Sequence, residues 1–135
     1  MYGNDEYQMN YRNLDFENTL RKYRMQHIVH YLQGVKTDNI LEIGSGDNPL
    51  FLFYNDFKRM DIVEPGNIFY SETKSKIGGD QRISIINAFI EEQAQFMQND
   101  YDVIVIGGFL HEIDNPEEVL RCVKKLTNSN TKVIT

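Results

Sequence analysis

The sequence has little of what identifies several common classes of protein. Its 135 residues include one cysteine, Cys122, which excludes an internal disulfide framework and a cysteine-based zinc cluster. No apolar run approaches the roughly 20 residues that span a bilayer, and the polar, tyrosine-rich start does not resemble a signal peptide. We therefore expect one domain of cytoplasmic location without a membrane partner.

Positive charge is also scarce. Fourteen Lys and Arg stand against twenty Asp and Glu, a net charge of −6 at pH 7. Because phosphate binding needs clustered cations, this balance disfavours a nucleic-acid partner. Residues 1–36 hold five basic and four acidic residues, net +1, whereas residues 37–135 hold nine and sixteen, net −7. We expect residues 1–36 to form an N-terminal helical cap segment on an α/β core of residues 37–135.

Short apolar runs alternate with helical patterns along the core. Strands are predicted at residues 39–44, 60–63, 82–86, 101–106 and 132–135. Helices are predicted at residues 18–33, 49–57, 68–75 and 89–98, and from the cap at Asn115 onward, where Leu120, Val123 and Leu126 repeat. This alternation predicts an α/β fold with a doubly wound, mainly parallel sheet of about five strands. Such sheets bind ligands outside the carboxyl ends of their strands.

The loop after the first predicted strand is rich in glycine. It reads Glu42-Ile-Gly-Ser-Gly-Asp-Asn-Pro49. Gly44 and Gly46 allow a tight turn and a close approach of the backbone to a ligand, and a helix beginning at Asn48 or Pro49 would direct free N–H groups to the same place. Glu64 follows the second predicted strand, where a carboxylate can accept hydrogen bonds from ribose hydroxyls. The pattern favours a nucleotide-like ligand.

Two nucleotide-binding patterns compete for this loop. A dinucleotide site expects G-x-G-x-x-G, but the third glycine position, counted from Gly44, is Pro49. The pattern E-x-G-x-G is matched by Glu42, Gly44 and Gly46, and it resembles motif I of the class I S-adenosylmethionine-dependent methyltransferases. Over roughly residues 37–135, further segments resemble later motifs of that family in the same order: Val63-Glu64-Pro65, Asn87-Ala88-Phe89, the stretch from Tyr101 to Pro116 and residues 117–126.

The resemblance implies a Rossmann-like core that transfers a methyl group from S-adenosylmethionine to a small or medium-sized acceptor, leaving S-adenosylhomocysteine. It also implies the cofactor-binding residues. Glu42 would hold the loop or reach the cofactor through water, Gly44, Ser45 and Gly46 would face the methionine moiety, and Asn48 would stand where many members carry a third glycine. The ribose would lie at Glu64 and Pro65, and the adenine at Asn87 and Ala88. Gly107 and Gly108 would lie beneath the sulfonium.

The resemblance places His111 near the methyl group. With a reference pKa near neutrality, an imidazole there is a candidate general base, and anchoring of the loop is the alternative. After the fourth strand stands Gly107-Gly108-Phe109 rather than an N-x-P-F/Y motif, which disfavours nucleobase or amide amino groups as acceptors. No metal is expected, because His27 and His30 lack an evident third ligand.

Two N-terminal features remain open. Arg12, Arg21, Lys22 and Arg24 either bind an anionic substrate or the cofactor carboxylate, or form a solvated helix face. Tyr7 and Tyr11 either form a lid over the cofactor or are disordered.

The end of the chain departs from the family. Methyltransferase sheets normally have seven strands, whereas this chain ends at Thr135, within the predicted fifth. We expect a truncated chain, or a minimal variant that covers its exposed fifth strand by forming a homo-oligomer. The alternative function is a non-catalytic methyltransferase-like module that acts through a partner chain or self-association. A nicotinamide oxidoreductase ranks third, because the third fingerprint glycine is absent.

Overall fold

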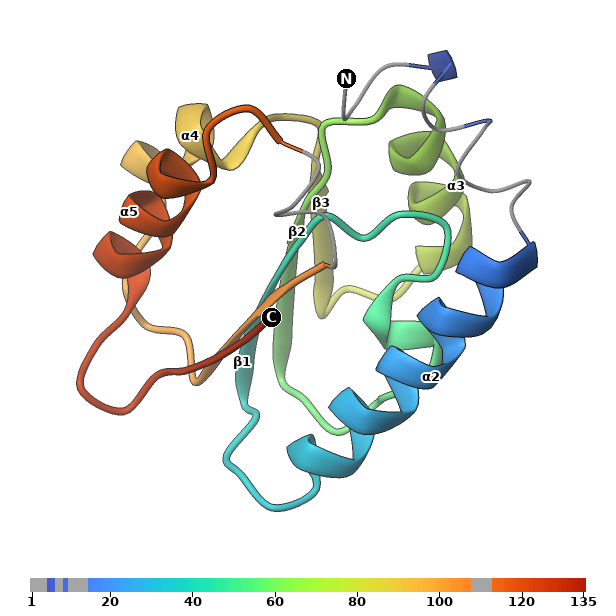
Figure 1. The fold of residues 1–135 in the computed structure, drawn as a ribbon. Coiled ribbons are helices and arrows are strands. Elements are labelled where there is room, and N and C mark those ends of the chain that lie inside the picture. The colour runs from blue at the N-terminus through green and yellow to red at the C-terminus, as the bar shows by residue number, and fades with distance from the viewer. Residues whose placement is uncertain (1–4, 7–8, 10–14, 108–112) are drawn as a thin grey trace.

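The computed structural model describes residues 5–6, 9, 15–107 and 113–135, and within them a parallel sheet lies between two layers of helices (Figure 1). The elements from residue 15 onward are α2 (Asp15–Leu32), β1 (Asn39–Ile43), the 3-10 turn η1 (Leu50–Leu52), β2 (Arg59–Val63), α3 (Asn67–Ile77), β3 (Ile83–Ile86), α4 (Ile90–Gln93), the 3-10 turn η2 (Ala94–Phe96), β4 (Val103–Ile106), α5 (Pro116–Leu126) and β5 (Lys132–Ile134).

The sheet has the topology expected of a doubly wound fold. Its strand order is β3-β2-β1-β4-β5, and all four pairings are parallel. The chain proceeds from β1 outward to β3 and then returns to place β4 on the other side of β1, so the switch point lies between β1 and β4. The predicted fold class is confirmed, and ligands of such sheets bind at this point, outside the carboxyl ends of the strands.

Alternate residues of each strand face opposite helical layers. Ile40 of β1 packs in a cluster with Leu32 of α2 and Leu50 of η1. The next residue, Leu41, packs in a second cluster with Ile90 of α4 and Val119 of α5. Figure 1 shows the same division, with α2 and α3 on one face of the sheet and α4 and α5 on the other. Burial on both faces explains why the strands are apolar throughout.

The helix after Asn115 begins as predicted, but its buried face differs. The Asn115 side chain accepts a hydrogen bond from the Glu118 N–H at 3.2 Å, as an N-cap does. The buried stripe consists of Val119, Val123 and Leu126, whereas Leu120 is exposed. Of the predicted repeat, Val123 and Leu126 are buried, and Val119 takes the place expected for Leu120.

The helix predicted over residues 49–57 is not formed, and this difference affects the candidate site. Only Leu50–Leu52 form a 3-10 turn, and Pro49 precedes it in an extended conformation without a side-chain cap. No helix therefore presents its first N–H groups to the glycine loop. The helix predicted over residues 89–98 is likewise reduced to the four residues of α4 and the turn η2.

Among the described residues, β5 pairs only with β4 and forms an edge of the sheet. Self-association through this edge stays a prediction, which sedimentation velocity over a range of concentrations can check. No helix within residues 15–107 and 113–135 is long and apolar enough to cross a bilayer.

Candidate cofactor-binding site

The loops after β1 and β4 cross closely at the switch point. Backbone hydrogen bonds continue the sheet into them, because Gly44 N–H donates to the Val63 carbonyl at 2.9 Å and Gly107 N–H donates to the Ile43 carbonyl at 2.8 Å. Gly44 and Gly46 have φ angles of 77° and 57°, which disfavour side chains. A Cβ on Gly107 would lie 2.4 Å from the Gly44 carbonyl oxygen. The crossing thus requires glycine in both loops.

Glu42 lies buried beneath the glycine loop. Its two carboxyl oxygens accept hydrogen bonds from the Leu50 N–H at 3.2 and 3.1 Å, which holds the end of the loop over β1. Burial raises the pKa of Glu42 to about 8; the bond from Leu50 opposes this shift and the nearby Glu64 adds to it. The carboxyl group is therefore mostly protonated at pH 7.

Glu64 connects the loops after β1 and β2. One carboxylate oxygen accepts from the Gly46 N–H at 2.9 Å and the other from the Gly66 N–H at 2.7 Å, with the Ser45 hydroxyl at 3.4 Å. Burial raises the pKa of Glu64, and the hydrogen bonds from Gly66 and Gly46 oppose that shift. The side chain is fully buried, so the ribose-binding role implied by the resemblance stays a prediction.

The adenine-binding residues expected after β3 lie beside Glu64. Asn87 donates its side-chain amide to the Glu64 carbonyl at 3.0 Å and to the Pro65 carbonyl at 3.4 Å. These bonds join the loops after β2 and β3, and Ala88 follows as a half-buried residue. A contact of Asn87 or Ala88 with adenine stays a prediction.

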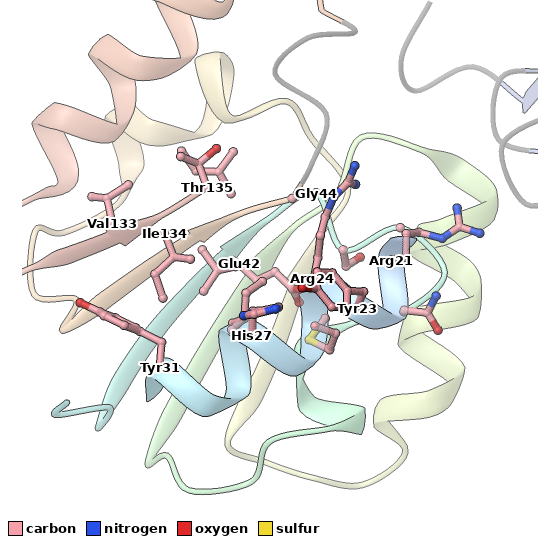
Figure 2. Close-up of a pocket in the computed structure, with 18 of the residues that line it drawn as sticks. Arg21, Tyr23, Arg24, His27, Tyr31, Glu42, Gly44, Val133, Ile134 and Thr135 are labelled. Carbon is pink, nitrogen blue, oxygen red and sulfur yellow. The ribbon is translucent and has the colours of Figure 1, made fainter. Parts of the chain in front are cut away.

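A cavity of about 850 Å³ opens beside the loop crossing and extends between α2 and the sheet (Figure 2). Six of the predicted cofactor-binding residues line it: Glu42, Gly44, Ser45, Gly46, Asn48 and Gly107. Glu64, Pro65, Asn87 and Ala88 are not among its lining residues. The structure therefore brings together the part of the predicted site assigned to the methionine moiety.

The sequence did not indicate the other walls of this cavity. Helix α2 contributes Arg21, Arg24, His27 and Tyr31, and the end of β5 contributes residues 133–135. The N-terminal charge pattern drew attention to Arg21 and Arg24, but nothing local placed them opposite β5. Lys22 of the same basic cluster is exposed and does not line the cavity.

Several predicted residues lie outside the described residues. These are Gly108, His111, Tyr7, Tyr11 and Arg12, so the proposed base and the proposed lid stay predictions. Within the described ranges, no group of three metal-ligating side chains gathers at one place. Cys122 is half-buried, and desolvation raises the pKa of its thiol, which opposes nucleophilic reactivity.

The cavity fits a cofactor of nucleotide size. Its volume falls within the roughly 300–1,000 Å³ of small-molecule sites, and its wall at the loop crossing is backbone without side chains, open to close approach. Beside Gly46, a Cβ would meet nothing within 4 Å, so there is free space above the loop.

No family model and no curated protein matches the sequence. The fold does match solved structures. The plantazolicin methyltransferase BamL, solved with S-adenosylhomocysteine and a substrate analogue, superposes with a TM-score of 0.72 at 16% identity, over 87% of this chain and 46% of its own. A Leishmania major S-adenosylmethionine-dependent methyltransferase gives 0.68 at 19% identity, over 85% and 49%.

A third neighbour has a different reaction. The [4+2]-cyclase SpnF matches with a TM-score of 0.66 at 12% identity, over 78% of this chain and 41% of its own. The chain spans about half the length of the solved structures it matches. These likenesses show that the chain has the Rossmann-like fold of S-adenosylmethionine-dependent methyltransferases, and a fold by itself does not fix the reaction.

Proposed function

We propose that this chain binds S-adenosylmethionine at the crossing of the loops after β1 and β4 and transfers its methyl group to a small or medium-sized acceptor. The observation that carries the proposal is the glycine crossing itself. Gly44, Gly46 and Gly107 form side-chain-free backbone at the switch point of a methyltransferase fold, and they line a cavity of cofactor size. The solved neighbours that act on S-adenosylmethionine support this assignment.

The residues of the chain divide the task of holding the cofactor. Gly44, Ser45 and Gly46 would contact the methionine moiety, and Glu42 would hold their loop through its bonds to Leu50. The Glu64 carboxylate accepts hydrogen bonds from the Gly46 and Gly66 N–H groups. It would bind a ribose hydroxyl in place of one of these N–H groups. The amide N–H released in such an exchange needs another partner, because a buried donor left unpaired costs roughly 1–3 kcal/mol.

The bound cofactor supplies a methyl group already activated on a sulfonium, so the protein contributes mainly position and orientation. An acceptor hydroxyl or amine loses its proton as it gains the methyl group. His111 is the predicted base for that proton. Gly107 lines the cavity without a side chain, which would leave room for an acceptor to approach.

Calorimetric titration of the chain with S-adenosylmethionine and S-adenosylhomocysteine tests the binding step. Gly107→Ala forces a Cβ to 2.4 Å from the Gly44 carbonyl, so the two loops must separate and we expect about tenfold weaker binding or worse. Gly79→Ala is the matched control, because a Cβ there meets nothing within 4 Å. It should bind as the unaltered chain does.

The outcomes separate the candidate functions. Absence of binding by the unaltered chain would contradict the proposal. If Gly107→Ala and Gly79→Ala weaken cofactor binding equally, the assignment of the site to the loop crossing is contradicted. Binding without formation of S-adenosylhomocysteine on a panel of hydroxyl and amine acceptors would favour the non-catalytic module.

A further inference from the structure

One wall of the cavity carries positive charge in a chain that is acidic overall. Arg24 and His27 are three residues apart on α2, so both side chains lie on the face that lines the cavity. Arg21 joins them one turn earlier. The chain as a whole carries a net charge of −6, so the two guanidinium groups of Arg21 and Arg24 on one wall are a local excess of positive charge.

No charged acid of the cavity wall balances Arg24. Among the described residues, Glu42 is the only acidic side chain that lines the cavity, and its pKa of about 8 leaves it mostly uncharged at pH 7. Arg21 has Asp47 at 3.6 Å and bonds to Asn18. The ion pairs found among the described residues do not include Arg24. A partly buried guanidinium with no carboxylate beside it favours an anionic ligand.

The rest of this region is apolar or aromatic. Tyr31 and Ile28 of α2 stand on one side, and Val133 and Ile134 of β5 stand on the other. Figure 2 shows Tyr31 and His27 on α2 across from the end of β5, and Arg24 extending toward the glycine loop. The region fits a ring or short apolar body with one charged end.

We infer that Arg24 binds the carboxylate of an anionic acceptor whose apolar or aromatic body lies between α2 and β5. The inference rests on the proposed function, since the acceptor must share the cavity with the cofactor. It assigns the acceptor to small organic acids. The guanidinium would both select the acid and fix one end of it, while the walls hold its apolar body between α2 and β5.

A pair of matched probes tests the charge requirement. We would titrate the full chain, saturated with S-adenosylhomocysteine, with 4-hydroxybenzoate and with 4-hydroxybenzamide, which has nearly the same shape but no charge. The unaltered chain should bind the acid at least about tenfold more tightly than the amide. Equal affinities, or no binding of the acid, would overturn the inference.

Three variants locate the charge. Arg24→Gln should remove the preference for the acid, and Arg24→Lys should restore part of it. Lys22→Gln removes the same charge from an exposed position outside the cavity, so the preference should persist. If Lys22→Gln loses the preference for the acid as fully as Arg24→Gln does, the preference reflects net charge alone and the assignment to Arg24 is overturned. Circular dichroism of each variant confirms that it is folded.

The cofactor also carries a carboxylate, and a further titration separates the two sources. S-adenosylhomocysteine has this group, whereas 5′-methylthioadenosine lacks it. If Arg24→Gln weakens the first ligand but not the second, Arg24 serves the cofactor and the acceptor assignment fails. If the unaltered chain binds no S-adenosylhomocysteine but still prefers the acid when titrated alone, the proposed function fails and the anion site stands.

Discussion

Glu42 shows how one residue can support a binding loop at a cost to the fold. Its carboxyl group holds Leu50 but is buried, and desolvation raises its pKa to about 8. In the unfolded chain the same group titrates near 4.5. Between these two values the folded state binds more protons than the unfolded state. The free energy of unfolding must therefore fall as pH rises through this interval, and level off above about pH 8.

Replacement of Glu42 by Gln removes this titration and keeps an acceptor for the Leu50 N–H. We expect the stability of Glu42→Gln relative to the unaltered chain to increase by about 3 kcal/mol between pH 5 and pH 8. Urea unfolding at both pH values measures it. Glu91→Gln, an exposed change on α4, is the control for removal of an acidic residue. Parallel pH profiles for Glu42→Gln and the unaltered chain would refute this account of Glu42.

At the residue scale, the motif of Glu42, Gly44 and Gly46 is the local pattern whose named residues all line the cavity. Glu42, Gly44 and Gly46 are close in sequence, and their spacing alone indicates a tight turn against a ligand. The role of Leu50 as the partner of Glu42 was not visible, because that bond depends on how residues after Pro49 return over β1. Arg24 reaches the cavity only through the packing of α2, which no short motif encodes.

At the scale of elements, capping signals predicted helix starts better than apolar content predicted helix length. Asn115 and Pro116 open an eleven-residue helix as expected. Asn48 and Pro49 give the same signal, yet only a three-residue turn follows. The two starts differ in their caps: the Asn115 side chain accepts from the Glu118 N–H, whereas Pro49 stands extended at the N-cap of the turn and forms no side-chain cap bond.

The buried face of α5 gives a test at this scale. Val123 is 3% exposed and packs between α5 and the sheet, so Val123→Ala should lower the free energy of unfolding by roughly 1–3 kcal/mol. Leu120 is 46% exposed, and Leu120→Ala should cost no more than about 0.5 kcal/mol. Chemical denaturation of both variants compares them. If Leu120→Ala lowers the free energy of unfolding more than Val123→Ala does, Leu120 belongs to the buried face, as the sequence predicted.

For the molecule as a whole, alternation of strands and helices was sufficient to predict the sheet. Apolar strands buried on both faces require helices on both sides, and right-handed crossovers then permit few arrangements. The cavity could not be predicted in the same way. Two of its walls come from α2 and from the end of the chain at β5, whose lining residues lie more than 100 residues apart in sequence.

Because the cavity joins distant elements, the proposed cofactor should stabilise the whole molecule. The glycine loops continue from β1 and β4, the central strands of the sheet, so their ligand-binding geometry exists only when the sheet is formed. S-adenosylhomocysteine at one hundred times its dissociation constant should then raise the free energy of unfolding by about 2.7 kcal/mol. For a chain of this size, that is a rise in Tm on the order of 10 °C.

Thermal unfolding over a series of ligand concentrations checks this expectation, and two comparisons give it meaning. Gly107→Ala should require higher concentrations for the same rise above its own unliganded Tm, because its separated loops bind more weakly. NADH at the same concentrations should have no effect, since Pro49 occupies the third fingerprint position of a dinucleotide site. If Tm rises with NADH and not with S-adenosylhomocysteine, the cavity binds a nicotinamide cofactor instead. This follows because only a ligand that binds the folded state can raise Tm.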